Sequence, residues 1–253
     1  MPSNPIVDVF ADVDALAAAA ATYFADRAQE AIAARGRFMV ALAGGTTLRA
    51  LYSLLATERR DAVQWPAVHV FWSDERHVPP TRPESNFGAA QDVMLSRVPV
   101  PAAQVHRIRA ERPDAATVAA RYERTLRREF SLAADAWPVF DLVLLGMGPD
   151  GHTASLFPGS DALTCTDRLV LAPWVEIHQA HRLTLSLPVL NHAAHVAFLV
   201  SGKAKAAVLR DVLEGPEPPD VLPARAVRPA DGRVSWFVDR AAAACLGGSL
   251  SGI

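Results

Sequence analysis

The chain has 253 residues, of which 51% are hydrophobic and 21% are charged, and its formal net charge is −2. This composition excludes a disordered chain, and the small net charge provides no global field for binding nucleic acid or an anionic membrane. Only two cysteines occur, without a CxxC pair, which argues against a disulfide framework and suits a reducing cytosol.

The N-terminus has no basic segment leading into an apolar one, so we expect no secretory signal. The longest run of small apolar residues, 15–21, is far shorter than the ~18–20 residues that a membrane helix needs. No repeat, linker-like tract or change of composition divides the chain. We therefore expect a single soluble, cytoplasmic domain over residues 1–253, with no nucleic-acid or membrane partner.

Short apolar runs rich in branched side chains predict strands along the whole chain. They lie at 6–10, 37–43, 68–72, 139–145, 168–172, 182–187, 195–200 and 234–238, with a weaker candidate at 106–108. The run at 182–187 alternates cleanly between apolar and polar residues, which favours a position near a sheet edge.

Helices are predicted between these strands. Asp12 is a suitable N-cap for a long first helix, and Gly36 is a suitable residue to end it. Further helices are expected at 48–56, from about 86, at 118–130, after Ser201 through 213, and at 239–245. The glycine turn after 145 is expected to lead into a helix of at most two turns, which Pro158 ends.

Alternating strands and helices predict an α/β fold, with a mostly parallel, Rossmann-like sheet flanked by helices on both faces. In such sheets ligands bind beyond the carboxyl ends of the strands. Four polar motifs follow predicted strands: Gly44-Gly45-Thr46-Thr47, Asp74-Glu75-Arg76, Asp150-Gly151-His152 and Ser201-Gly202-x-x-Lys205. We expect all four to meet at one edge of the sheet.

The first of these motifs predicts an anion site. Two glycines let an oxyanion approach the backbone N–H groups, the following helix adds partial positive charge, and Thr46 adds a hydroxyl. Lys205 and Arg76 are candidate cations for a phosphate. The alternatives are a plain tight turn at Gly44-Gly45, a solvated Lys205, and an ion pair between Arg76 and the neighbouring carboxylates.

His152 is the candidate general base, because imidazole takes up and returns a proton near neutral pH. No GxSxG motif supports a nucleophilic serine, so His152 would act on water, with Asp150 or Asp74 setting its tautomer. No HExxH-type pattern supports a metal. The other histidines, His69 and His106 among them, are expected to be ordinary surface or core residues.

The sequence pattern Gly146-x-Gly148-x-x-Gly151 also occurs in dinucleotide-binding turns. That fingerprint needs a full helix and an acidic residue at the end of the next strand. Here Pro149 and Pro158 interrupt the helix, and the run at 168–172 is not followed by a carboxylate. We therefore expect no nucleotide cofactor.

Together the motifs resemble those of the 6-phosphogluconolactonase family, within the glucosamine-6-phosphate deaminase/ribose-5-phosphate isomerase fold group. The resemblance runs from about Phe38 to the segment at 236–243, and the block at 150–158 is its most specific part. The stretches that carry it are residues 43–47, 73–79 with Ser85-Asn86, 146–158 and 201–205. The sequence departs from the family at Ala43, usually serine, and at Leu48, usually proline.

The resemblance implies hydrolysis of 6-phospho-D-glucono-1,5-lactone without a metal or organic cofactor. We expect a monomer or weak homo-oligomer, although the sequence itself does not fix the oligomeric state. It places His152 as general base, with Asp150 beside it. The residues that it places around the substrate and its phosphate are Gly44, Gly45, Thr46, Asp74, Arg76, Asn86, Arg182 and Lys205.

Two other functions stay open. An amino-sugar-phosphate deaminase or isomerase of the same fold usually has tyrosine where Arg76 stands, and a Phe-Asn-Glu stretch after Asp-Gly-His, where this chain has residues 153–157. A non-catalytic sugar-phosphate sensor usually carries a DNA-binding arm, for which the first strand, beginning at about residue 6, leaves no room.

Overall fold

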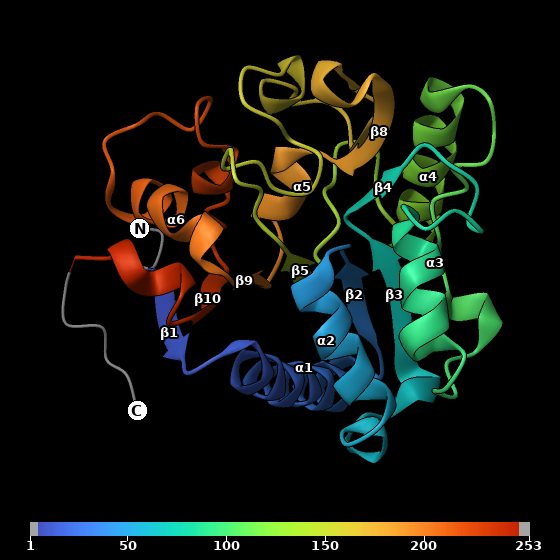
Figure 1. Ribbon diagram of the computed structural model, residues 1–253. Helices are drawn as coiled ribbons and strands as arrows, with labels where there is room; N and C mark the ends of the chain where they lie inside the picture. The colour runs from blue at the N-terminus through green and yellow to red at the C-terminus, as the bar shows by residue number, and fades with distance from the viewer. Residues whose placement is uncertain (1–4, 248–253) are drawn as a thin grey trace.

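The computed structural model describes residues 5–247, and a six-stranded parallel sheet forms its centre (Figure 1). The strand order is β1-β10-β9-β5-β2-β3, and each neighbouring pair is parallel. The strands of this sheet are β1 (Ile6–Phe10), β2 (Phe38–Leu42), β3 (Val68–Trp72), β5 (Leu142–Leu145), β9 (His195–Val200) and β10 (Arg233–Asp239). The predicted α/β architecture with a mostly parallel sheet is confirmed.

Helices cover both faces of this sheet. Figure 1 shows α1 and α2 below the sheet, and α5 and α6 above it. The helices are α1 (Val13–Arg35), α2 (Thr46–Ala56), α3 (Asn86–Ala90), α4 (Ala115–Glu129), α5 (Leu187–Asn191) and α6 (Ala206–Glu214). The predicted ends of α1 are correct: Asp12 accepts hydrogen bonds from the first-turn N–H groups, and Gly36 ends the helix at φ 72°.

A second, antiparallel sheet stands beside the carboxyl end of β3. It comprises β4 (Asp74–Arg76), β8 (Ala180–Leu185), β6 (Val170–Leu171) and β7 (Trp174–Val175). The expectation that 182–187 lies near an edge is wrong, because β8 pairs with β4 on one side and with β6 and β7 on the other. Its polar residue Thr184 is buried as well, and the Thr184 hydroxyl accepts from the Ser155 N–H at 3.2 Å.

Two more local predictions are wrong. Residues 106–108 form no strand, since the pairing there stops at a single bridge between Val70 and Val105. No helix follows the glycine turn, because Thr153 bridges back to Leu156 and Ala154 takes a positive φ of 48°. The start of α2, by contrast, lies two residues earlier than expected, directly on the glycine pair.

The core between the layers is a single cluster of buried apolar residues that includes all five residues of β2 and all four of β5. Burial of both faces explains why these strands are continuously apolar. No described helix is long and apolar enough to cross a membrane.

Tyrosine hydroxyls hold the carboxyl ends of two neighbouring strands. The Tyr52 hydroxyl accepts from the Ala43 N–H (3.1 Å) and donates to the Ala43 carbonyl (2.7 Å). The Tyr122 hydroxyl does the same at Trp72, at 2.8 Å from N and 3.1 Å from O. Burial raises the pKa of both phenols, which therefore stay protonated and able to donate. These bonds satisfy backbone groups where the chain leaves the sheet.

Removing the Tyr52 hydroxyl is expected to destabilise the protein. Tyr52→Phe leaves the buried N–H and carbonyl of Ala43 without this partner, and each unsatisfied group costs about 1–3 kcal/mol. Urea unfolding measures the loss. Tyr23→Phe is the control: its part-buried hydroxyl bonds to a His195 ring nitrogen, so a smaller loss is expected. Equal midpoints for Tyr52→Phe and the unmodified protein would contradict this prediction.

Candidate active site

A cleft of about 270 Å³ lies at the carboxyl edge of the parallel sheet. It sits where the chain connections diverge, since β2 leads outward to β3 whereas β5 leads to β9 on the other side. Such switch points are the usual ligand sites of open α/β sheets. The predicted residues in its lining are Gly44, Gly45, Thr46, Asp74, Arg76, Asn86, His152 and Lys205. The four motifs therefore meet as expected.

The other two predicted site residues lie beside the cleft. Asp150 hydrogen bonds to Nδ1 of the His152 ring. Arg182 stands opposite Arg76 in the β4–β8 register. Burial and the charge of Arg76 lower the pKa of Arg182, while Asp74 and Glu75 raise it. Arg182 is thus within electrostatic reach of the cleft, although it does not line it.

The glycine turn after β5 fixes the position of His152. The Gly148 N–H donates to the His152 carbonyl (2.8 Å), and the Gly151 N–H donates to the Gly148 carbonyl (3.2 Å). A side chain at 148 would collide with this arrangement, because a Cβ there would lie 2.0 Å from Nδ1 of His152 and 2.5 Å from Oδ1 of Asp150. Glycine at 148 is therefore what allows the imidazole to lie against its own turn.

Asp150 sets the tautomer of His152. Its Oδ1 lies 2.6 Å from Nδ1 of the ring. Burial raises the pKa of the Asp150 carboxyl, but the hydrogen bond and the charge of His152 outweigh it and bring the pKa down to about 2. An ionised carboxylate can only accept, so Nδ1 carries the proton. Nε2, which has no hydrogen bond among residues 5–247, is left with its lone pair available as a base.

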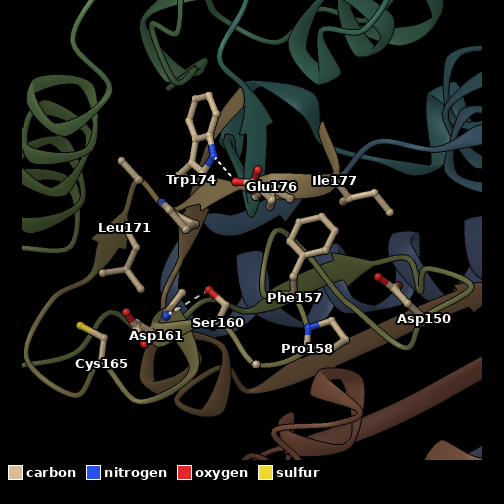
Figure 2. A pocket seen from close by; sticks show the side chains of 15 residues that line it. Asp150, Phe157, Pro158, Ser160, Asp161, Cys165, Leu171, Trp174, Glu176 and Ile177 are labelled. Carbon is tan, nitrogen blue, oxygen red and sulfur yellow. Dashed lines mark hydrogen bonds between the residues drawn. The ribbon is translucent and has the colours of Figure 1, made fainter. Parts of the chain in front are cut away.

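Phe157 fixes the ring from one face and separates the cleft from a second cavity. Its ring stacks on His152 with centroids 4.2 Å apart. The second cavity, of about 770 Å³, is larger, with Leu171, Trp174 and Ile177 in its lining beside Asp150, Asp161 and Glu176. Figure 2 shows Phe157 near the middle of this lining and Asp150 to one side. None of the predicted phosphate ligands lines it, so the predicted anion site lies in the smaller cleft.

The opposite side of the cleft is suited to an anion. Gly45, at φ 120°, is the N-cap of α2 and offers no side-chain acceptor, so the first N–H groups of this eleven-residue helix keep their capacity to bind an anion. Lys205 lines the same cleft and forms no ion pair with any described residue. Burial lowers the pKa of its ammonium, and the charge of Asp150 raises it.

The two carboxylates of β4, Asp74 and Glu75, lie in different surroundings. Asp74 lies in the lining, where Oδ2 accepts from the Ser155 hydroxyl (2.9 Å) and Oδ1 from the Asn86 amide (3.2 Å). Glu75 is buried behind it and accepts from the backbone N–H groups of Asn86 (2.7 Å) and Phe87 (2.8 Å). Burial raises the pKa of Glu75. These N–H groups lower it. Glu75 therefore fixes the loop that presents Asn86.

The Arg76 guanidinium donates to the Glu84 carbonyl at 2.6 Å. It forms no ion pair with Asp74 or Glu75 among the described residues, contrary to the alternative considered for it. Arg76 therefore keeps further N–H donors for an anion in the cleft.

A family model described as glucosamine-6-phosphate isomerases/6-phosphogluconolactonase matches residues 11–236. The chain belongs to this family. It is 42% identical to human 6-phosphogluconolactonase over 254 residues, covering 97% of this chain and 95% of the relative. It is 39% identical to the 6-phosphogluconolactonase of Synechocystis, covering 94% and 97%.

Solved structures agree with this membership of the glucosamine-6-phosphate isomerase/6-phosphogluconolactonase family. A 6-phosphogluconolactonase from Trypanosoma brucei superposes with a TM-score of 0.86 at 30% identity, covering 96% of this chain and 99% of that one. A monomeric glucosamine-6-phosphate deaminase gives a TM-score of 0.78 at 22% identity, which shows a shared fold alone.

The two residues that depart from the family pattern, Ala43 and Leu48, are both buried and both line the cleft. Ala43 is buried and held by the Tyr52 hydroxyl, and Leu48 is buried in the core. Thr47 and Ser201, which sequence reasoning did not select individually, also line the cleft, and their hydroxyls hydrogen bond at 2.7 Å. Their places at the ends of β2 and β9 were the available signal.

Ser155 was also missed. It lies within the most specific motif, but only the structure reveals that its hydroxyl holds Asp74, a residue far away in the sequence. Phe157 was missed as a contact of His152 for a related reason: the predicted helix would have directed its ring elsewhere.

The hydrogen bond between Asp150 and His152 predicts a change in the pKa of Asp150 when the ring is removed. In His152→Ala the hydrogen bond and the ring charge are gone, so the pKa of Asp150 is expected to rise from about 2 to its ordinary value of 3.8 or higher. NMR titration of the side-chain carboxyl carbons measures it. Glu111 is the internal control, because a hydrogen bond from Arg107, not His152, lowers its pKa to about 2. An unchanged pKa of Asp150 in the variant would refute the pairing.

Proposed function

We propose that this chain hydrolyses 6-phospho-D-glucono-1,5-lactone to 6-phospho-D-gluconate, a step of the oxidative pentose phosphate pathway, with His152 as general base. One observation carries the proposal: an imidazole oriented by a carboxylate and an anion site at an uncapped helix N-terminus open into the same cleft. The names of the relatives at 39% and 42% identity support the same substrate.

His152 would act through Nε2. The neutral ring removes a proton from water as the oxygen attacks the lactone carbonyl, and Asp150 stabilises the imidazolium that forms. The proton then passes to the departing ring oxygen as the carbon–oxygen bond breaks. The N–H groups of Gly148 and Gly151 do not serve as oxyanion donors, because both bond within the turn.

The phosphate would bind at the other side of the cleft. Gly44, Gly45 and Thr46 supply backbone N–H groups and a hydroxyl at the start of α2. Arg76 and Lys205 supply positive charge. Binding there, remote from the reacting carbonyl, would hold the ester in place beside His152, so binding energy serves orientation. Asp74, Asn86 and Arg182 would contact or orient the hydroxyl-bearing part of the substrate.

The hypothesis that the chain is an amino-sugar-phosphate deaminase or isomerase has less support. The deaminase neighbour shares only the fold at 22% identity. Residues 153–157 contain no glutamate to assist ring opening, and Thr153 instead donates to the Gly146 carbonyl at 2.8 Å. A non-catalytic sensor would bind sugar phosphate without turnover, which the assay below distinguishes.

We further propose that residues 1–253 form one cytoplasmic domain that acts as a monomer or weak homo-oligomer, without metal or organic cofactor in the reaction. The single apolar core cluster supports one domain. The composition, with two unpaired cysteines, supports a reducing compartment.

Two substitutions should separate the two sides of the cleft in a lactonase assay corrected for spontaneous hydrolysis. His152→Ala is expected to lower kcat by about 100-fold or more, since it removes the base. Lys205→Met keeps most of the packing of the side chain but removes its charge. It is expected to raise KM by about tenfold, with a smaller effect on kcat.

The chain offers a matched control for the lysine. Its only two lysines are Lys203 and Lys205, both in the 3-10 helix η7 (Lys203–Lys205), and Lys203 is exposed and outside the cleft lining. Lys203→Met should therefore leave KM unchanged. Near-normal kcat in a folded His152→Ala would eliminate the proposed base, and sugar-phosphate binding without turnover by the unmodified protein would favour a sensor.

A further inference from the structure

Two histidines and a glutamate gather away from the cleft. His69 is the second residue of β3, so it lies toward the amino end of the strand, whereas the cleft lies beyond the carboxyl ends. His106 follows the bridge between Val105 and β3, and Glu129 is the last residue of α4. Three segments distant in sequence thus each present one ligand-type side chain.

The distances within this cluster suit a metal ion. Nδ1 of His69 lies 3.3 Å from Nε2 of His106, and that nitrogen lies 3.8 Å from Oε2 of Glu129. All three atoms lie within 4.8 Å of one another. A tetrahedral Zn²⁺ site with metal–ligand bonds of ~2.0–2.1 Å requires ligand atoms about 3.3 Å apart. The two ring nitrogens hydrogen bond to each other here, and the ion would replace that bond. The longest separation would have to shorten by up to about 1.5 Å to reach this spacing.

Neighbouring residues contact two of the three side chains, Glu129 and His106. The Arg128 guanidinium donates to Oε1 of Glu129 at 2.8 Å, which directs Oε2 toward the histidines. The Phe71 ring stacks on His106 with centroids 4.5 Å apart. These contacts restrict the positions of His106 and Glu129.

The cluster also has an entry path. His106 and Arg128 line an open cleft of about 580 Å³. Positive charge acts against a cation here, because the Arg128 guanidinium is bonded to Glu129. We therefore expect weaker binding than at a closed structural site.

We propose that Nδ1 of His69, Nε2 of His106 and Oε2 of Glu129 bind Zn²⁺, with water completing the tetrahedron. Imidazole and carboxylate are ligands that this ion accepts together. The ion would join β3, the segment after Val105 and the end of α4, so it stabilises the fold. It takes no part in the reaction, since the cluster and the cleft occupy different ends of β3.

Metal titration of the full chain tests this proposal. After treatment with EDTA and its removal, one equivalent of Zn²⁺ should bind in a competition assay with a fluorescent chelator, and it should raise the melting temperature. Co²⁺ should give the visible absorption of a four-coordinate site. His69→Ala, at a half-buried position, and Glu129→Gln should each weaken Zn²⁺ binding at least tenfold.

Two controls separate this site from other histidines. His192→Ala changes an exposed ring that bonds to the Pro188 carbonyl, and His152→Ala changes the cleft. Both should retain the affinity of the unmodified protein. The proposal is overturned if no Zn²⁺ binds, if His69→Ala and Glu129→Gln bind it as well as the unmodified protein does, or if His152→Ala removes the binding. Melting curves confirm that each variant is folded.

Discussion

The hydrogen bond between Asp150 and His152 is the interaction on which the proposed chemistry depends. It exists because the chain turns tightly enough for a carboxylate to meet a ring two residues later, at 2.6 Å. Gly148 leaves room for this pair, since a Cβ at that position would occupy the space of both side chains. Phe157 then stacks on the ring. The base is thus oriented by its own local sequence and requires little from the rest of the fold.

The parallel sheet contributes the other half of the site by bringing remote segments together. β2 and β5 are neighbours, so the loops after them face each other, and the loop after β9 lies next in order. This places the start of α2 and Lys205 in the same cleft as His152. An activated ester needs a positioned base and a held anion more than it needs a nucleophile, and both are present here.

Sequence reasoning succeeded where a signal was local and strong. The apolar runs of the parallel strands, the caps of α1 and the four polar motifs were all readable, because burial on both faces and glycine turns leave distinct patterns. It failed where long-range pairing decides the structure. β4 and β7 have only three and two residues, so neither leaves a periodic pattern, although strands were predicted over β6 and β8. The contacts of Ser155 with Asp74 and of His69 with His106 are likewise invisible without the fold.

The most direct measurement compares two alanine substitutions in the glycine turn. A Cβ at 148 would lie 2.0 Å from Nδ1 of His152, whereas one at 146 meets nothing nearer than the Gly44 carbonyl oxygen at 3.9 Å. Displacing a catalytic group by about 1 Å can cost about 100-fold in rate. Gly148→Ala should therefore lose about 100-fold in lactonase kcat while remaining folded, and Gly146→Ala should lose only a few-fold. Equal rates for the two variants would contradict the role assigned to the turn.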